Sequence, residues 1–342
     1  MTERVLTRRE LNRALLARQL LLERVQLPVG RVLERVAGVQ AQDVIPPFIG
    51  LWTRIAGFER RQLTRALERR TAVRATLMRR TIHIVTARDY AHFAPATLPM
   101  VQRLYSSYLR DREPVKNVEQ LAARALAYAR EPRTSAEMRD FLGGDDVWWR
   151  IRRHALFVNA PGDDPWSFSR RRRFVAASAW LDRPLADVEA ARDRLVRRYL
   201  AAFGPATASD ISAWSGLSAL ELRPSLERLG LRRFRDERGR QLLDVPGAPL
   251  PDPLTPAPPR LLPLFDNTIL AHADRTRVIS DEHRRIVIRG GLVDSVFLVD
   301  GFVAGVWRLR KGSFELEPFD RLSHRTEREL RREGAAVEEF VA

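Results

Sequence analysis

Two glutamines and an aspartate stand close together in the segment GVQAQDV, as Gln40, Gln42 and Asp43. An amide neither titrates at neutral pH nor attacks carbon, so it is not an acid, a base or a nucleophile. Its oxygen can instead orient a water molecule and place partial negative charge beside a cationic transition state. In extended chain, residues two apart point the same way, so both amides would face one site and Asp43 would face away. The competing interpretation is a polar pair that ends a helix and ties down a loop.

Other catalytic groups are scarce in this sequence. It contains no cysteine, which excludes disulfides and thiolate metal sites. It contains six histidines, and no two of them have the i, i+4 spacing of a helical metal pair. We therefore expect no metal and no cofactor. The charged N-terminal residues and the lack of an apolar run of ~18 residues predict a soluble, untargeted, cytoplasmic protein without a membrane partner.

The basic charge is the strongest signal in the composition. The formal net charge is +16, the isoelectric point is near 11.2, and 57 of the 59 basic residues are arginine. The planar guanidinium binds phosphate through two parallel hydrogen bonds and stacks on bases. A mutational bias toward GC-rich codons would also favour arginine over lysine. The sign and size of the charge still indicate a polyanionic partner, and nucleic acid is the most economical one.

The residues around the glutamines predict helices followed by a hairpin. Three helices are expected, at residues 8–24 with Thr7 as its cap, 29–39 running into the motif, and 60–70. Pro46 and Pro47 prevent the second helix from continuing. Residues 72–90 alternate apolar and polar side chains around Arg79 and Arg80, which predicts a β-hairpin. Helices followed by a hairpin are typical of a winged helix–turn–helix.

The same pattern recurs twice along the chain. The second copy has expected helices at 117–130, 134–142 and 145–156, with two short strands within 156–169. The third has helices at 187–204, 207–218 and 219–230, with a two-stranded wing at 231–245. A proline-rich stretch follows. After it, strands are expected at 277–281, 284–290, 295–301, 302–309 and 312–319, and a helix at 325–341.

These patterns predict a mainly α fold with β structure, of the α+β class. It would consist of tandem winged-helix units and a small C-terminal β domain. The expected boundaries are 1–112 with the Gln-X-Gln motif, 113–184, 185–246, a linker at 247–260, and 261–342 ending in a helix.

The likeness to a known family rests on four stretches: LARQLLL (16–22), GVQAQDV (38–44), RTIHIVTARDY (80–90) and FDNTILAHADRTRVI (265–279). Together they resemble the AlkZ/YcaQ family of winged-helix DNA glycosylases, and LVDGFVAGVWRL (298–309) extends the resemblance. The family is described as tandem winged helices that form a C-shaped cradle around DNA. Its members excise alkylated purines, including both sides of certain interstrand crosslinks. Its catalytic signature is Gln–X–Gln or Gln–X–Asp, and Gln40–Ala41–Gln42 matches the first.

The resemblance implies a monofunctional DNA glycosylase that acts as a monomer on double-stranded DNA with alkylated purines. A purine alkylated at N7 or N3 is already cationic and leaves without protonation, so Gln40 and Gln42 would hold the attacking water. Lys116 and Lys311 are far from the motif in sequence, which makes a Schiff base improbable. The alternatives are a non-enzymatic winged-helix DNA-binding or regulatory protein, and a relative that has lost turnover. A pure binder has no need of the glutamine pair.

Six further side chains are candidates for contact with DNA or the lesion: Asp43, Arg79, Arg80, His83, Arg171 and Arg172. A lone histidine in an apolar strand usually donates to a backbone group. The family carries a histidine at the position of His83. The resemblance therefore makes a role at the DNA, in lining the lesion pocket or contacting a phosphate, an equal alternative to this structural role. The arginines suit phosphate contacts, and a solvated face is the competing interpretation for them. Asp43 is expected to cap or hold its loop, although its carboxylate could assist catalysis.

A second polar cluster occupies residues 266–275. It consists of Asp266, Asn267, His272, Asp274 and Arg275. Its spacing fits no metal site and no catalytic triad, so we expect a hydrogen-bonded structural junction there.

Overall fold

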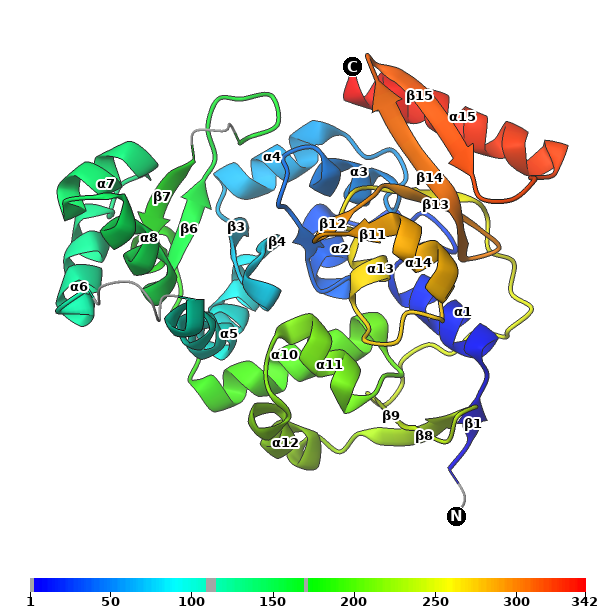
Figure 1. The fold of residues 1–342 in the computed structure, drawn as a ribbon, viewed down its shortest axis with the longest axis horizontal. Coiled ribbons are helices and arrows are strands. Elements are labelled where there is room, and N and C mark those ends of the chain that lie inside the picture. The colour runs from blue at the N-terminus through cyan, green and yellow to red at the C-terminus, as the bar shows by residue number, and fades with distance from the viewer. Residues whose placement is uncertain (1–2, 109–114, 169–171) are drawn as a thin grey trace.

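The computed structural model describes residues 3–108, 115–168 and 172–342, and it has a mixed α+β fold with several small sheets (Figure 1). The expected α+β class is therefore confirmed. The helices are α1 (Arg8–Arg18), α2 (Val29–Arg35), α3 (Pro46–Trp52), α4 (Arg60–Glu68), α5 (Ala87–Tyr108), α6 (Val118–Tyr128), α7 (Ser135–Leu142), α8 (Asp145–His154), α9 (Ala177–Trp180), α10 (Val188–Phe203), α11 (Ala208–Ser215), α12 (Ala219–Arg228), α13 (Asn267–Leu270), α14 (Asp281–Val287) and α15 (His324–Val341). None of these helices, in the ranges described, is long and apolar enough to cross a membrane.

The strands belong to four separate sheets. They are β1 (Val5–Leu6), β2 (Val39–Gln40), β3 (Ala72–Thr76), β4 (Ile82–Thr86), β5 (Arg133–Thr134), β6 (Phe157–Ala160), β7 (Arg173–Ala176), β8 (Arg232–Asp236), β9 (Gln241–Asp244), β10 (Arg260–Leu262), β11 (Ile288–Arg289), β12 (Leu292–Val293), β13 (Val296–Val299), β14 (Phe302–Arg310) and β15 (Ser313–Pro318). The sheet orders are β1-β8-β9, β10-β13-β14-β15, β11-β12 and β2-β4-β3-β6-β7-β5.

Helix α1 begins as its sequence predicts and ends earlier. Thr7 and Glu10 form a capping box, in which each side chain accepts a hydrogen bond from the other residue's backbone amide. The helix ends at Arg18 because Leu20 adopts a left-handed conformation with φ of 58°, so the expected end at residue 24 is wrong. Residues 245–259 contain no helix or strand, as the prolines predict. The Arg18 guanidinium binds the carbonyl of Pro249, which holds this stretch against α1.

The six-stranded sheet joins the first two expected units. The hairpin β3–β4 pairs with β2 on one side and meets β6 on the other. The contact between β3 and β6 has a single register pair, Arg74 opposite Asn159. Figure 1 shows β3 and β4 beside β6 and β7, with α5 at the lower end of this seam. The residues at this seam therefore come from parts of the chain about 85 positions apart.

The third expected unit follows its sequence pattern closely. Gly216, with φ of +82°, ends α11 and turns the chain toward α12. Strands β8 and β9 form the expected wing, with Gly239 in the turn between them. Strand β1 adds to this wing in parallel, which links the N-terminus to the third unit. Helix α12 is tied to its neighbours by ion pairs, from Arg228 to Asp193 at 2.8 Å and from Glu221 to α5 and α10.

Two expected groups of strands differ from the structure. Among the described residues 156–168 the one strand is β6, because Pro161 and Pro165 cannot donate to a sheet. Its partner strand is β7. In place of the expected strand at 277–281, a turn leads into α14, which begins at Asp281 and includes residues 284–287. The Ser280 hydroxyl accepts a hydrogen bond from the amide of His283 and starts that helix. The later strands and the terminal helix agree with their predictions, and α15 packs Leu330 and Val337 against the sheet core.

A buried ion pair joins the N-terminal and C-terminal parts of the core. The two terminal nitrogens of Arg54 donate to the two oxygens of Asp266, each at 2.9 Å. Burial opposes ionisation of Asp266, but Arg54 and the hydrogen bonds from Thr268 hold its pKa below its usual range. Asp266 is thus a carboxylate at neutral pH and requires its partner.

We expect Arg54→Ala to lower the free energy of unfolding by about 3–5 kcal/mol, because the Asp266 carboxylate stays buried without a counter-charge. Urea unfolding followed by circular dichroism measures the change. The matched control is Arg331→Ala, which removes an exposed i, i+4 pair with Glu327 and should cost no more than about 0.5 kcal/mol. Equal effects of the two substitutions would contradict a structural role for the buried pair.

Candidate active site

A tight helix end places the glutamine motif at the edge of the sheet. After α2, Ala37 and Gly38 adopt left-handed conformations, and their amides donate back to carbonyls in the last turn of the helix. A side chain on Gly38 would lie 2.5 Å from Cγ1 of Val85, so only glycine fits. The expected helix at 29–39 therefore stops at residue 35. Strand β2 follows at once, with Gln40 opposite His83 of β4.

Gln40 is buried and already has a cationic partner. Its Oε1 accepts a hydrogen bond of 2.8 Å from Nη2 of Arg79, and its side chain is only 7 % exposed. The same guanidinium donates to Oδ1 of Asn267 at 3.1 Å and to the carbonyl of Trp214 at 3.0 Å. Asn267 in turn donates to the carbonyl of Gly38 at 3.3 Å. Arg79 thus holds the Gln40 amide in one orientation.

Gln42 is exposed, and its amide is anchored differently. Its Oε1 accepts a hydrogen bond of 3.1 Å from the backbone amide of Ile82. Between the glutamines, the Ala41 amide donates to the Ile82 carbonyl at 2.7 Å. Gln42 lines the pocket described below, whereas Gln40 lines a small hollow beside Asn267. Strand β2 ends at Gln40, so its pairing with β4 covers only the first of the two glutamines. That both amides face one site stays a prediction.

Arg74 is a site residue that the sequence analysis missed. Its side chain is buried, and it donates to the Ala41 carbonyl from Nε at 3.2 Å and from Nη2 at 2.9 Å. Burial lowers the pKa of Arg74 to about 9; the charge of Arg172 adds to this shift and Asp43 opposes it. Hydrogen bonds thus hold both the amide and the carbonyl of Ala41 in place. The signal in the sequence was an arginine at the centre of an otherwise apolar strand, AVRAT.

The hairpin β3–β4 closes through two arginines in left-handed conformations. Arg79 has φ of 52° and Arg80 has φ of 62°, and the Thr81 amide donates to the Met78 carbonyl at 3.0 Å. This is the geometry of a type I′ turn, which usually contains asparagine and glycine. From this turn the Arg79 side chain reaches Gln40, whereas the Arg80 side chain lines the pocket described next. Burial, followed by the charge of Arg275, lowers the pKa of Arg79 to about 10, so it stays a cation at neutral pH.

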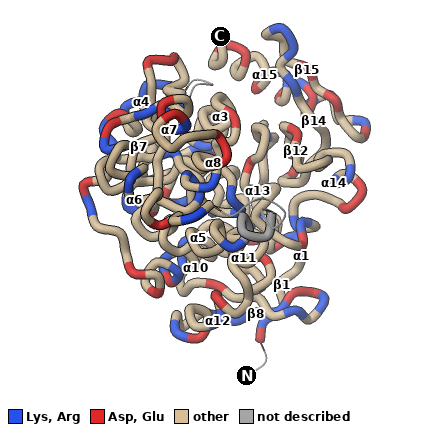
Figure 2. The backbone as a smooth tube through the Cα atoms, turned by 60° about the vertical axis from the view of Figure 1, so that its left-hand side comes forward, with Lys and Arg blue, Asp and Glu red and all other residues tan. Residues whose placement is uncertain are grey.

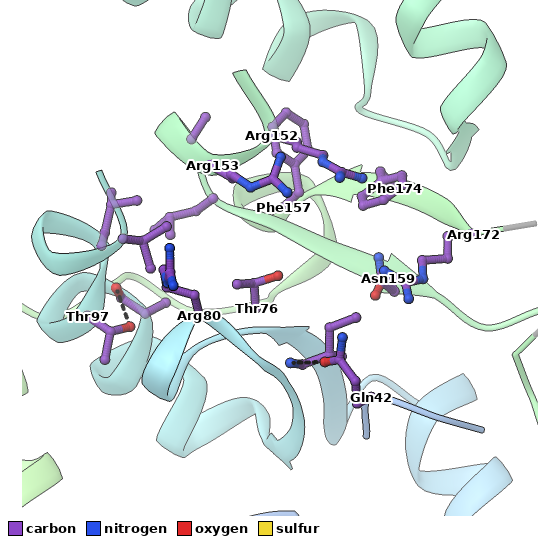
Figure 3. Close-up of a pocket in the computed structure, with 16 residues that line it drawn as sticks. Gln42, Thr76, Arg80, Thr97, Arg152, Arg153, Phe157, Asn159, Arg172 and Phe174 are labelled. Carbon is purple, nitrogen blue, oxygen red and sulfur yellow. Dashed lines mark hydrogen bonds between the residues drawn. The ribbon is translucent and has the colours of Figure 1, made fainter. Parts of the chain in front are cut away.

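A polar pocket of about 190 Å³ opens beside Gln42 at the seam between β3 and β6. Its polar lining consists of Gln42, Thr76, Arg80, Thr97, Asn159, Arg152, Arg153 and Arg172. No aspartate or glutamate contributes to the described lining. Figure 3 shows Arg152 and Arg153 above the pocket, Arg172 and Asn159 on its right, Gln42 below and Arg80 on its left. Figure 2, in which α6–α8 face the viewer, shows basic positions along α8.

The structure separates the predicted site residues into two groups. Gln42, Arg80 and Arg172 lie around the pocket, and burial lowers the pKa of Arg172. Gln40 and Arg79 are outside its lining. The Arg79 guanidinium donates to three protein oxygens, and its contact with a phosphate stays a prediction. Asp43 is exposed and accepts a hydrogen bond of 2.7 Å from the next amide in its loop. Arg171 lies outside the described residues. The sequence analysis did not identify three further residues of the lining, Asn159, Arg152 and Arg153.

His83 is fully buried in this structure. Its side chain is 0 % exposed, and its Nδ1 lies 3.1 Å from the Thr81 carbonyl. Burial, followed by the charge of Arg79, lowers the pKa of His83 to about 3. The ring is therefore neutral at physiological pH and has no surface for a phosphate. Of the two predicted roles, this burial favours the structural one.

The second polar cluster is the predicted hydrogen-bonded junction. Asp266 binds Arg54, and Nε2 of His272 lies 3.0 Å from the Phe203 carbonyl. Asp274 accepts hydrogen bonds from Thr276 and Arg240. Across the described ranges, no three His, Cys, Asp or Glu side chains are grouped to hold a metal ion.

Comparisons with known proteins identify the family. The family model for AlkZ-like DNA glycosylases matches residues 33–340. The chain belongs to this family. The DNA glycosylase AlkZ of Streptomyces sahachiroi has a similar solved structure, with a TM-score of 0.83 and 20 % identity over 98 % of this chain and 97 % of that one. At this identity the likeness shows the AlkZ-like fold.

A curated relative gives a partial sequence match. The interstrand DNA cross-link repair glycosylase of S. sahachiroi is 27 % identical over 167 residues. The match covers 45 % of this chain and 43 % of that protein, so it spans less than half the length of the relative. The resemblance inferred from the sequence is confirmed at the level of the AlkZ-like family.

We expect the His83 ring to stay neutral in the folded protein down to about pH 4. Its folded pKa of about 3 lies below the usual 6.5, so the unfolded chain takes the proton first. Its contribution to stability is present above pH 6.5 and is lost as the pH falls from 6.5 toward 3. NMR titration of the ring resonances, assigned with His83→Asn, measures this. A midpoint above pH 5.5 would contradict the buried, neutral assignment.

Proposed function

We propose that this protein is a monofunctional DNA glycosylase that excises cationic alkylated purines from double-stranded DNA, as a monomer in the cytoplasm. Membership of the AlkZ-like family supports the reaction class. The observation that carries the proposal is the exposed amide of Gln42 at the edge of an arginine-lined pocket. Interstrand crosslinks and bulky natural-product adducts present the same cationic leaving group, so they belong to the proposed substrate class.

The proposed architecture is a tandem array of winged helices at residues 1–112, 113–184 and 185–246, followed by the linker at 247–260 and the C-terminal domain at 261–342. The successive hairpins β3–β4, β6–β7 and β8–β9, each preceded by helices, support this division. The first two hairpins share one sheet, which places the pocket at their junction.

In the proposed mechanism, the cationic purine departs without protonation, and the protein positions water and stabilises the oxocarbenium-like sugar. An amide oxygen has two lone pairs. One lone pair on Gln42 accepts from the Ile82 amide, which leaves the other for a hydrogen bond from the attacking water. Because Ile82 and Arg79 hold the two amides in place, little reorganisation is needed when charge develops on the sugar. Asp43 supports the loop.

One observation favours the alternative of a non-enzymatic DNA-binding protein. Both amide oxygens already accept hydrogen bonds within the protein, at 2.8 Å for Gln40 and 3.1 Å for Gln42. A purely structural pair would show the same bonds. Excision by glutamine variants separates the two functions, because binding alone requires neither amide.

We expect Gln42→Ala to reduce excision of an N7-alkylpurine by about 10²-fold or more, the scale of one preorganised polar contact. Gln40→Ala should have a similar effect, and the double variant should be little worse than the poorer single one. Duplex affinity should barely change. Single-turnover excision and fluorescence anisotropy measure the two quantities, and thermal unfolding checks that each variant is folded.

Asp43→Asn is the control for this series. If Asp43 only supports its loop, the substitution should lower activity modestly and mainly through stability. Wild-type excision by both glutamine variants, together with an inactive Asp43→Asn, would assign catalysis to the carboxylate instead.

We further expect an intact abasic site as the product, without strand cleavage. Lys116 and Lys311 do not line the pocket, and a Schiff-base lyase requires an amine there. Mild base treatment should be needed to cleave the reacted strand. A covalent protein–DNA adduct trapped by borohydride would show a lyase mechanism and contradict this expectation.

A further inference from the structure

The pocket beside Gln42 is cationic on several sides. Arg80 comes from the hairpin turn, Arg152 and Arg153 come from α8, and Arg172 precedes β7. Arg74 lies behind this lining, and the charge of Arg172 helps to lower its pKa. Arg172 and Arg74 therefore repel each other, and an anion in the pocket beside them would relieve this repulsion.

A cationic purine is a poor occupant of such a pocket. The proposed leaving base carries positive charge before excision, and the described lining offers it no carboxylate. The arginines are accompanied by Thr76 and Asn159, which can both donate hydrogen bonds. A phosphodiester offers acceptors to these two donors, and its negative charge complements the arginine lining.

We propose that this pocket binds a phosphodiester of the damaged strand next to the lesion, and that the damaged base lies elsewhere. This inference rests on the proposed glycosylase function. Arg80, Gln42 and Thr76 are exposed, so the pocket joins the protein surface and suits a group within a longer chain. A volume of about 190 Å³ is more than ten times the ~10–15 Å³ that holds one water, so a phosphate group has room.

The proposal has a consequence for the product. Base excision leaves the sugar–phosphate backbone uncut, so the phosphate contact survives the reaction. The protein should therefore hold abasic DNA through the same arginines, and a duplex with a stable tetrahydrofuran abasic analogue reports on the contact without turnover.

The test combines chemical and protein substitutions on that duplex. Single phosphates near the analogue are replaced in turn by neutral methylphosphonates, and affinities are measured by fluorescence anisotropy at one salt concentration. The proteins are wild type, Arg172→Gln, Arg80→Gly and the control Arg325→Gln, whose exposed side chain lies on α15. Glycine adopts the positive φ of position 80 readily, so Arg80→Gly should keep the turn.

One phosphate position should weaken wild-type binding by about tenfold or more when neutralised. Arg172→Gln and Arg80→Gly should bind the unmodified duplex more weakly, and should lose little further affinity at that position. Their losses at the other positions should stay additive. Arg325→Gln should show the wild-type profile at every position.

Additive losses at every position, or wild-type binding by both pocket variants, would overturn the phosphate assignment. If millimolar orthophosphate fills the pocket and duplex binding does not change, the assignment is also overturned, because the pocket then binds a free anion. Single-turnover excision of N7-methylguanine separates this proposal from the function beneath it. If the base is excised but the affinity losses from the protein and DNA substitutions add at every position, the phosphate site alone is refuted. If these losses are not additive and no base is excised, the glycosylase function alone is refuted.

Discussion

The arrangement of the site depends on the guanidinium of Arg79, which is held by three neutral oxygens. Its acceptors are the Gln40 amide, the Asn267 amide and the Trp214 carbonyl. These acceptors belong to β2, the start of α13 and the end of α11, so one cation connects three distant parts of the chain. No carboxylate forms an ion pair with Arg79 among the described residues, and its charge is balanced by dipoles alone. A planar fork can reach three acceptors at once, which a lysine ammonium on a flexible stem does less well. Gln40 is therefore part of the framework as well as of the motif.

The high arginine content consequently has two physical roles. Arg18, Arg54 and Arg74 are buried and bind carbonyl or carboxylate oxygens of the protein, so they contribute to cohesion. Arg80 and Arg172 instead contribute to the polar pocket. Net charge alone does not distinguish these groups, because an internal arginine bonded to carbonyls still counts as +1. The excess of +16 thus overstates the number of cations available to a polyanion.

The features that the sequence predicts well are local. The capping box of α1, the hairpin around Arg79 and Arg80, and the third helix–turn–helix with its wing all follow from residues within a few positions of one another. The features that it misses are long-range or depend on backbone conformation. The partner of β6 is β7, beyond an irregular stretch, and the end of α2 depends on a left-handed Ala37, which the residue type disfavours. The pocket is missed because its lining comes from β4, α5, α8 and β6, and no local pattern brings these together.

The pocket also gives a physical reason for an amide at position 42. Four guanidiniums line the same cavity as this side chain. A carboxylate there would form ion pairs with them, and its charge would be neutralised by arginine instead of being directed at a developing sugar cation. An amide carries no net charge and forms no ion pair, and the Gln42 oxygen accepts from the backbone amide of Ile82. Asp43 agrees with this reasoning, because its carboxylate lies outside the pocket lining and accepts from its own loop. The proposed phosphate site and the proposed water-orienting amide are therefore compatible at adjacent positions.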